Sequence, residues 1–152
     1  MIRHGLKVVA AVAVLGVAGC GGDDDSNKTL SYSDFSNQAN EICKDSNEKS
    51  APLDSKFTGK ATEDAALFDE LIPQIEEARD EFAKLEPPEE LKATFDGFLA
   101  TTDQQIANAK KAQAAAKAGD QAGYVAIIKA TQPLSEQSKV QGSQLGAAEC
   151  AK

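Results

Sequence analysis

The sequence predicts an all-α fold in which four amphipathic helices form an antiparallel up-down-up-down bundle. Two observations favour helices over strands. The composition is rich in Ala, Glu, Lys, Gln and Leu, whereas aromatic residues make up only 5% of the chain. After position 30, apolar residues recur at spacings of three and four, in segments separated by Pro, Gly or short polar stretches. Because these joints are short, successive helices should lie side by side.

The first two helices are expected over residues 33–50 and 62–85, with residues 51–61 as the loop between them. Thr62 is a suitable N-cap for the second helix, because its hydroxyl can accept a hydrogen bond from the first turn. The first helix carries a weak apolar stripe, formed by Phe35, Ala39 and Ile42. The second carries a longer stripe, formed by Phe68, Leu71, Ile75, Ala78, Phe82 and Leu85. A stripe of this kind can pack along a neighbouring helix.

The sequence EPPEEL, residues 86–91, separates the second helix from the third. Proline disfavours helix at the preceding residue but suits a first helical position. The third helix is expected to run to Ala118 and to end at Gly119, and Asp120 can cap the fourth. The third stripe consists of Leu91, Phe95, Phe98, Thr102, Ile106 and Ala109. The fourth is more polar and consists of Tyr124, Ile127, Thr131, Leu134, Ser138, Leu145 and Ala148.

Two prolines interrupt these helices, Pro73 in the second and Pro133 in the fourth. Each lacks an amide donor and crowds the carbonyl four residues back, so we expect each to kink or split its helix. In an up-down-up-down bundle both prolines lie at a similar height. One hypothesis is that they open the bundle there and create a ligand site, and the other is that they only accommodate curvature. The candidate ligand-binding residues at that height are Leu71, Ile75, Thr131 and Leu134.

The N-terminal segment has a different character from the helices. Arg3 and Lys7 precede an apolar run at residues 8–17, which would span about 15 Å as a helix, roughly half of a bilayer core. This length favours a secretory signal over a transmembrane helix. The run ends in VAGC, residues 17–20, which resembles the lipobox of bacterial lipoproteins. The alternative is an ordinary signal peptide with a chance cysteine.

The resemblance implies cleavage after residue 19 and acylation of Cys20, with palmitate as a typical chain. The domain plan is then a signal peptide at 1–19, a lipid-anchored, disordered acidic tether at 20–30 and a helical domain at 31–152. It also implies that the protein lies on the extracytoplasmic face of the cell membrane, held there by its lipid. This organisation is similar to that of small helical lipoproteins of unassigned role from high-GC Gram-positive bacteria.

Cys43 and Cys150 remain once Cys20 carries lipid. Exported proteins can keep disulfides, and the first and last helices of such a bundle are neighbours. We therefore predict a Cys43–Cys150 disulfide. The alternative is two separate buried thiols, since two cysteines without histidine do not complete a zinc site.

The remaining composition excludes several functions. The only histidine, His4, lies in the signal segment, so histidine-based catalysis is not available to the mature chain. Removal of Arg3 and Lys7 shifts the net charge from −8 to −10, which argues against nucleic-acid binding. We expect no enzyme activity, cofactor or metal. An acidic strip is interpreted as a solvated face, although it could attract a divalent cation or a basic partner; it consists of Glu76, Glu77, Asp80 and Glu81.

Two hypotheses of function follow. The first is a non-enzymatic, lipid-anchored domain that acts through contacts with an unknown protein partner. The second is a carrier that holds a small apolar or cationic ligand between its helices. A carrier should contain a cavity of a few hundred Å³, whereas a contact module should show an exposed apolar or charged patch. Polar residues of the fourth helix fit either a cavity lining or a wetter face of the bundle; they are Thr131, Gln132, Ser135 and Ser138.

Overall fold

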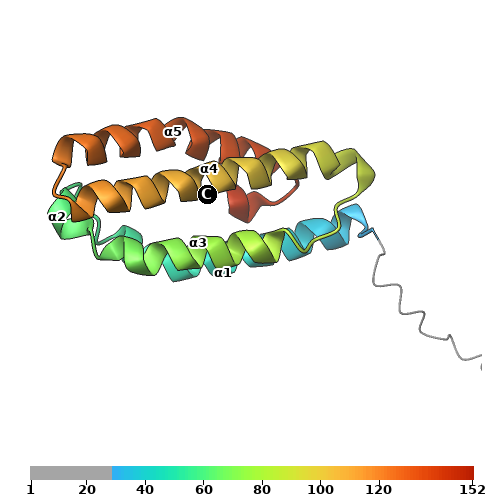
Figure 1. The fold of residues 1–152 in the computed structure, drawn as a ribbon. Coiled ribbons are helices and arrows are strands. Elements are labelled where there is room, and N and C mark those ends of the chain that lie inside the picture. Colours follow the sequence, from blue (N-terminus) through green and yellow to red (C-terminus); the bar gives the residue numbers. More distant parts are fainter. Residues whose placement is uncertain (1–28) are drawn as a thin grey trace, which may run out of the picture.

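The computed structural model describes residues 29–152, which contain helices and no strand (Figure 1). The predicted all-α class is confirmed. The signal segment 1–19, Cys20 and the tether up to residue 28 lie outside the described residues. The elements in chain order are α1 (Tyr32–Asp54), α2 (Ala61–Asp64), α3 (Leu67–Phe82), the 3₁₀ turn η1 (Glu89–Leu91), α4 (Lys92–Lys117), α5 (Gln121–Gln144) and the 3₁₀ turn η2 (Ala148–Ala151).

Helix α1 begins near the predicted position but ends later. The Ser31 hydroxyl oxygen accepts a hydrogen bond from the Asp34 amide at 3.1 Å, which caps the first turn. The helix then continues to Asp54, so the prediction of a loop from residue 51 is wrong. The extra turn buries Leu53, which is only 4% exposed. Pro52 is tolerated because it falls in the last turn, where it removes a single intrahelical bond.

The predicted second helix is divided into α2 and α3. The break falls at residues 65–66, where the Asp69 amide bonds to the Ala66 carbonyl three residues back, at 3.2 Å. Both α3 and α5 continue as helices through Pro73 and Pro133, so the prediction that either proline splits its helix is wrong. Both prolines are exposed, and the carbonyl that each leaves without an amide partner can therefore be hydrated.

The other helix junctions follow the sequence signals. The turn η1 begins directly after Pro88 and leads into α4. Helix α4 ends at Lys117, followed by Gly119 with a φ of 70°, a left-handed conformation that suits glycine. The Asp120 carboxylate caps α5 by accepting a hydrogen bond from the Gly123 amide at 2.9 Å. The boundaries around the third helix are thus local properties of the sequence.

Helix α5 is shorter than the predicted fourth helix. Its last residue is Gln144, whereas the predicted stripe continued to Ala148. Gly146 has a φ of 72°, and the Ala147 amide bonds to the Gly142 carbonyl at 3.0 Å, a pattern typical of a helix that ends at glycine. The chain then turns back, so that η2 contacts α1.

The long helices are arranged in two pairs. Figure 1 shows α4 alongside α5 and α1 alongside α3, and α3 also contacts α4. Contact between α1 and the C-terminal part of the chain runs mainly through η2. The first and last helices therefore meet near one end of the domain and are not packed along their lengths.

Two hydrophobic cores hold the helices together. The phenylalanine core lies where α1 and α4 begin and α3 and α5 end, and the tyrosine core lies at the opposite end of the domain. In these cores the Phe82 and Phe98 ring centroids are 4.7 Å apart and those of Phe68 and Tyr124 are 6.1 Å apart. The phenylalanine core consists of Phe35, Ala39, Phe82, Leu91, Phe95, Phe98, Leu145 and Ala147. The tyrosine core consists of Ala61, Phe68, Ile72, Ala112, Ala116 and Tyr124.

The C-terminal segment is fastened to α1 beside the phenylalanine core. The structure pairs Cys43 of α1 with Cys150 of η2 in a disulfide, as the sequence predicts, with Cα atoms 5.1 Å apart. Asn40 adds two hydrogen bonds: its Nδ2 donates to the Gly146 carbonyl at 3.2 Å, and its Oδ1 accepts from the Glu149 amide at 2.9 Å. This end of the domain is therefore held by apolar packing, a covalent link and polar contacts together.

Candidate functional site: a cavity between the two cores

A cavity of about 380 Å³ lies between the phenylalanine core and the tyrosine core, and all four long helices line it. This volume falls in the lower part of the usual range for small-molecule sites, roughly 300–1,000 Å³. The lining residues are Ile42, Cys43, Ser46 and Asn47 of α1; Phe68, Leu71, Ile75, Ala78, Arg79 and Phe82 of α3; Phe98, Thr102, Gln105, Asn108, Ala109 and Ala112 of α4; Ile128, Thr131, Ser135 and Ser138 of α5; and Cys150.

The cavity exists because the middle of α5 carries side chains too short to fill the space. Tyr124 and Gly142, near the two ends of α5, are the buried residues of this helix. Between them, the inward positions are taken by Thr131, Ser135 and Ser138, each only partly buried. In the described part of the chain α1 does not pack along α5, so these two helices do not close the gap against each other.

The wall that α3 contributes is apolar. Leu71, Ile75 and Ala78 line it at spacings of four and three, so they form one stripe on the helix. Helix α4 presents a mixed wall, in which Ala109 is apolar and Gln105 carries an amide. The cavity therefore has an apolar side and a polar side.

The polar side chains of the lining are only partly satisfied by the protein. The Thr131 hydroxyl donates to the Ile127 carbonyl at 2.9 Å, and Gln105 Nε2 reaches Ser135 Oγ at a long 3.5 Å. Both hydroxyl oxygens retain the capacity to accept further hydrogen bonds. Three other polar side chains of the lining make no hydrogen bond to the described part of the chain, namely Ser46, Asn108 and Ser138.

Arg79 is the charged residue of the lining, and its charge is already paired. Its Nε and Nη2 donate to the two carboxylate oxygens of Asp103 at 2.8 and 3.1 Å, and Nη1 lies 3.4 Å from Asp80. The hydrogen bond to Asp103 is the main reason why the pKa of Arg79 lies above its usual value. Within residues 29–152, the lining therefore offers no unpaired charge to a ligand.

The structure brings three of the four predicted ligand-site residues to this cavity. Leu71, Ile75 and Thr131 are part of the lining, whereas the partly buried Leu134 is not. Of the polar α5 residues, Thr131, Ser135 and Ser138 line the cavity, and Gln132 instead borders a shallower hollow on α5.

Helices α1 and α4 also line the cavity, although the predicted ligand-site residues came only from the second and fourth predicted helices. The inward stripe of α4 runs through Phe98, Thr102, Gln105, Ala109 and Ala112, at spacings of four, three, four and three. The predicted stripe shared Phe98, Thr102 and Ala109 with it but passed through Ile106, which is buried and does not line the cavity, in place of Gln105. The interruption of an apolar stripe by Thr102 and Gln105 was the available signal, because polar residues rarely face a dry core.

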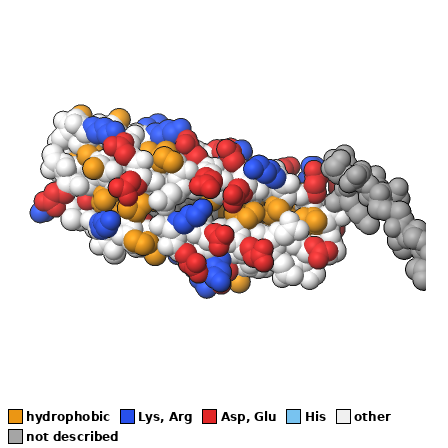
Figure 2. Space-filling model, turned by 90° about the horizontal axis from the view of Figure 1, so that it is seen from below, with side chains coloured by type: hydrophobic (Ala, Val, Ile, Leu, Met, Phe, Trp, Pro, Cys, Tyr) orange, Lys and Arg blue, Asp and Glu red, His pale blue; other side chains and the backbone are white. Residues whose placement is uncertain are grey.

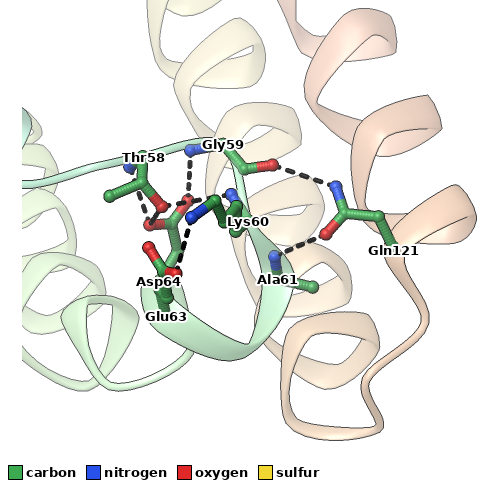
Figure 3. A network of polar contacts seen from close by, with 7 residues as sticks. All are labelled: Thr58, Gly59, Lys60, Ala61, Glu63, Asp64 and Gln121. Atoms are coloured by element: carbon green, nitrogen blue, oxygen red, sulfur yellow. Dashed lines mark hydrogen bonds and ion pairs between the residues drawn. The ribbon is translucent and has the colours of Figure 1, made fainter.

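Asp64, at the end of the domain that holds the tyrosine core, is fully buried although it carries a carboxylate. Its carboxylate accepts hydrogen bonds from the Thr58 amide at 2.8 Å and from the Gly59 amide at 2.9 Å (Figure 3). It also accepts one from the Tyr124 hydroxyl at 2.8 Å. Burial alone would raise the pKa of Asp64, but these hydrogen bonds outweigh it and lower the pKa below its usual value. Burial, and then the Asp64 carboxylate, raise the pKa of Tyr124.

Gln121 completes this network from α5. Figure 3 shows its side chain reaching the loop before α2, where Oε1 accepts from the Ala61 amide at 2.8 Å and Nε2 donates to the Gly59 carbonyl at 2.9 Å. These polar groups bond to one another, and none of them lines the cavity. We therefore interpret the network as a structural clasp that fixes the α2 end of the domain, and not as an active site.

The acidic strip predicted on the second helix is partly used in ion pairs. Glu76 lies 2.6 Å from Lys110 of α4, and Glu77 lies 3.6 Å from Lys49 of α1. These pairs are solvent-exposed, so they contribute little to stability. On the face shown in Figure 2, acidic and basic side chains are interspersed and hydrophobic side chains form small separate groups.

Comparisons with protein-family models, with curated proteins and with solved structures find no match for this chain. No helix within residues 29–152 has both the length and the apolar character needed to cross a membrane. In the same part of the chain, no three His, Cys, Asp or Glu side chains gather in a way that could hold a metal ion.

Proposed function

We propose that this protein is a lipid-anchored, extracytoplasmic binding protein, whose long helices form an antiparallel up-down-up-down bundle around a site for a small, largely apolar ligand. The observation that carries the proposal is the cavity of about 380 Å³ between the two cores. Its lining includes Leu71, Ile75 and Thr131, which lie at the height where one of the two hypotheses about Pro73 and Pro133 placed a ligand.

The anchoring part of the proposal rests on the VAGC sequence at residues 17–20 and on the disulfide, which suits an exported protein. Replacement of Cys20 by alanine should abolish labelling of the protein by a fatty-acid probe in the cells that produce it. Undiminished labelling of this variant, or a mature N-terminus elsewhere, would contradict the anchor.

The proposal includes no catalytic step. The mature chain has no histidine, and the buried carboxylate of Asp64 is committed to hydrogen bonds within the protein. Binding alone requires only a preformed cavity, which this arrangement provides.

Cavity-filling variants test the binding site. N-phenyl-1-naphthylamine is an uncharged probe that fluoresces in apolar surroundings, and the full chain carrying Cys20→Ser keeps anchor lipid from competing for it. We expect saturable binding to this protein. Adding Ala109→Leu, which grows into the cavity, should weaken binding by about tenfold or more, equivalent to about 1.4 kcal/mol.

The matched control is Ala107→Leu, which adds the same atoms to an exposed position of the same helix. It should leave probe binding unchanged. No saturable binding, or equal binding by the Ala109→Leu and Ala107→Leu variants, would overturn the proposed function.

A second candidate, docking of a protein partner, is favoured by the exposure of Val125 and Ile128, which are 49% and 40% exposed and one turn apart on α5. The other exposed large hydrophobic residue of α5, Val140, lies 12 residues beyond Ile128, which is about 18 Å along the helix at 1.5 Å per residue. The apolar surface is therefore small. If docking is the function, Val125→Glu should abolish capture of a partner in cells while leaving probe binding intact.

A further inference from the structure

The chemistry of the lining defines the class of ligand that the cavity would hold, an inference that rests on the proposed function. We propose that the ligand is an uncharged amphiphile with an apolar body and hydroxyl or carbonyl groups along one edge. Three properties of the lining carry this assignment: an apolar wall, a polar wall with unused hydrogen-bonding capacity, and the lack of an unpaired charge.

The apolar wall selects the body of the ligand. Leu71, Ile75 and Ala78 form a continuous stripe on α3, and Ile128 of α5 adds a further apolar side chain. Burial of hydrocarbon against these side chains is favourable in proportion to the area removed from water. A strongly hydrated molecule, such as a free sugar, would leave this wall without a partner.

The polar wall argues against a pure hydrocarbon. Ser135 and Ser138 of α5 and Asn108 of α4 face the cavity, and Ser138 and Asn108 have no hydrogen-bond partner in the described part of the chain. While the cavity is free of ligand, such groups need water as their hydrogen-bond partner. A ligand that displaces this water must replace its hydrogen bonds, or it loses affinity. Hydroxyl and carbonyl groups on one edge of the ligand would do so.

The charges of the lining argue against an ionic ligand. Arg79 is the lining residue with a charged side chain, and it is bound through two nitrogens to Asp103. An anion would meet a guanidinium whose charge Asp103 already neutralises, and among the described residues a cation would meet no carboxylate in the lining. Either ion would lose its hydration without a counter-charge in return. The cationic ligand that the sequence left open is therefore disfavoured.

A matched series of twelve-carbon amphiphiles tests this class. We would measure displacement of N-phenyl-1-naphthylamine from the full chain carrying Cys20→Ser, at concentrations below micelle formation. The competitors are 1-monododecanoylglycerol, which is uncharged, dodecanoate, which is an anion, and dodecyltrimethylammonium, which is a cation. The uncharged compound should displace the probe at concentrations about tenfold lower than either ion.

Removal of hydroxyls from the polar wall supplies the second arm. The double change Ser135→Ala and Ser138→Ala should raise the concentration of 1-monododecanoylglycerol needed for displacement by about fivefold, while probe binding itself changes little. The control is Ser143→Ala, which removes an exposed hydroxyl from the same helix and should have no effect.

The outcomes separate this inference from the proposed function. If the probe binds and Ala109→Leu blocks it, but an ion displaces it as well as 1-monododecanoylglycerol does, the ligand class is wrong and the binding site stands. The same holds if the serine variants leave the displacement curve unchanged. If the probe does not bind at all, both proposals fall.

Discussion

The two ends of the helical domain and its middle are built from different side chains. At one end Phe82 is 2% exposed among three other phenylalanine rings, and at the other Tyr124 is 2% exposed against Phe68. In the middle, the facing positions are taken by small or polar residues such as Thr131 and Ser135, and a cavity remains. The ends therefore hold the helices together, whereas the middle contains the cavity that we propose as a binding site. Changes at core residues that do not line the cavity, such as Leu91, should therefore affect stability, whereas changes in the cavity wall should affect binding.

The two ends also differ from each other. The phenylalanine core is closed by the Cys43–Cys150 disulfide, whereas the tyrosine core is closed by the hydrogen bonds of Asp64 and Gln121. A covalent link does not depend on pH, but a buried carboxylate does. We therefore expect one end to be sensitive to reductant and the other to acid.

The largest loss of stability is expected from Phe82→Ala. The removed ring contacts Phe35, Phe95 and Phe98, and its loss should lower the free energy of unfolding by about 3–5 kcal/mol. The comparison variant is Ile75→Ala in the cavity wall, which should cost about half as much or less, because its neighbours are less densely packed. Urea denaturation measures both. Equal losses would contradict the division between ends and middle.

Loss of the disulfide should have the next largest effect. The two cysteines are separated by 107 residues, so their joint replacement by serine should lower the free energy of unfolding by about 2–4 kcal/mol through the greater freedom of the unfolded chain. Reductant should shift the denaturation midpoint of the original protein toward that of the variant. If neither the serine replacements nor the reductant shifts the denaturation midpoint, the hydrogen bonds of Asn40 suffice to hold the C-terminal segment.

Asp64→Asn should destabilise the protein by about 2 kcal/mol at neutral pH, because an amide cannot accept all the hydrogen bonds that the carboxylate accepts. The folded pKa of Asp64 is lowered, so its contribution is present above the unfolded pKa of about 4 and is lost as pH falls through the folded pKa. The difference between the original protein and the variant should therefore shrink below about pH 4. A difference that stays constant with pH would rule out this role of the charge.

Tyr124→Phe should have the smallest effect, about 1 kcal/mol, because the ring stays and Asp64 keeps its backbone donors. The raised pKa of Tyr124 means that its contribution is present below the unfolded pKa of about 10 and is lost as pH rises through the folded pKa. The free energies of unfolding of the original protein and the Tyr124→Phe variant should therefore converge as pH rises above about 10. If Tyr124→Phe lowers the free energy of unfolding more than Asp64→Asn does, then the tyrosine hydroxyl, and not the carboxylate, contributes most to the clasp.

Much of the fold could be predicted from the sequence because its signals are local. Gly119 and Asp120 mark one helix junction through their own backbone and side-chain preferences, and Gly146 carried a similar signal for the end of α5 that the predicted stripe overran. The break at residues 65–66 carried no such local signal. It accompanies the burial of Asp64 against Tyr124, a residue 60 positions away in the chain.

The site was predictable only in part for the same reason. Pro73 and Pro133 pointed to the height of the cavity, although neither divides its helix. The side chains of Ser46 and Asn108 come from α1 and α4, and their place in the lining depends on how α1 and α5 stand apart. That separation is a property of tertiary packing, which spacing along one helix does not reveal.

We propose that the space between the two cores binds a ligand while core residues away from the cavity stay unchanged. Methyl-resolved NMR of the full chain carrying Cys20→Ser, titrated with N-phenyl-1-naphthylamine, tests it most directly. We expect the largest methyl chemical-shift changes at Leu71, Ile75 and Ile128, with little change at Leu91 and Leu145 of the phenylalanine core. Shifts that are largest at the exposed Val125 and Val140, or spread equally over both cores, would contradict it.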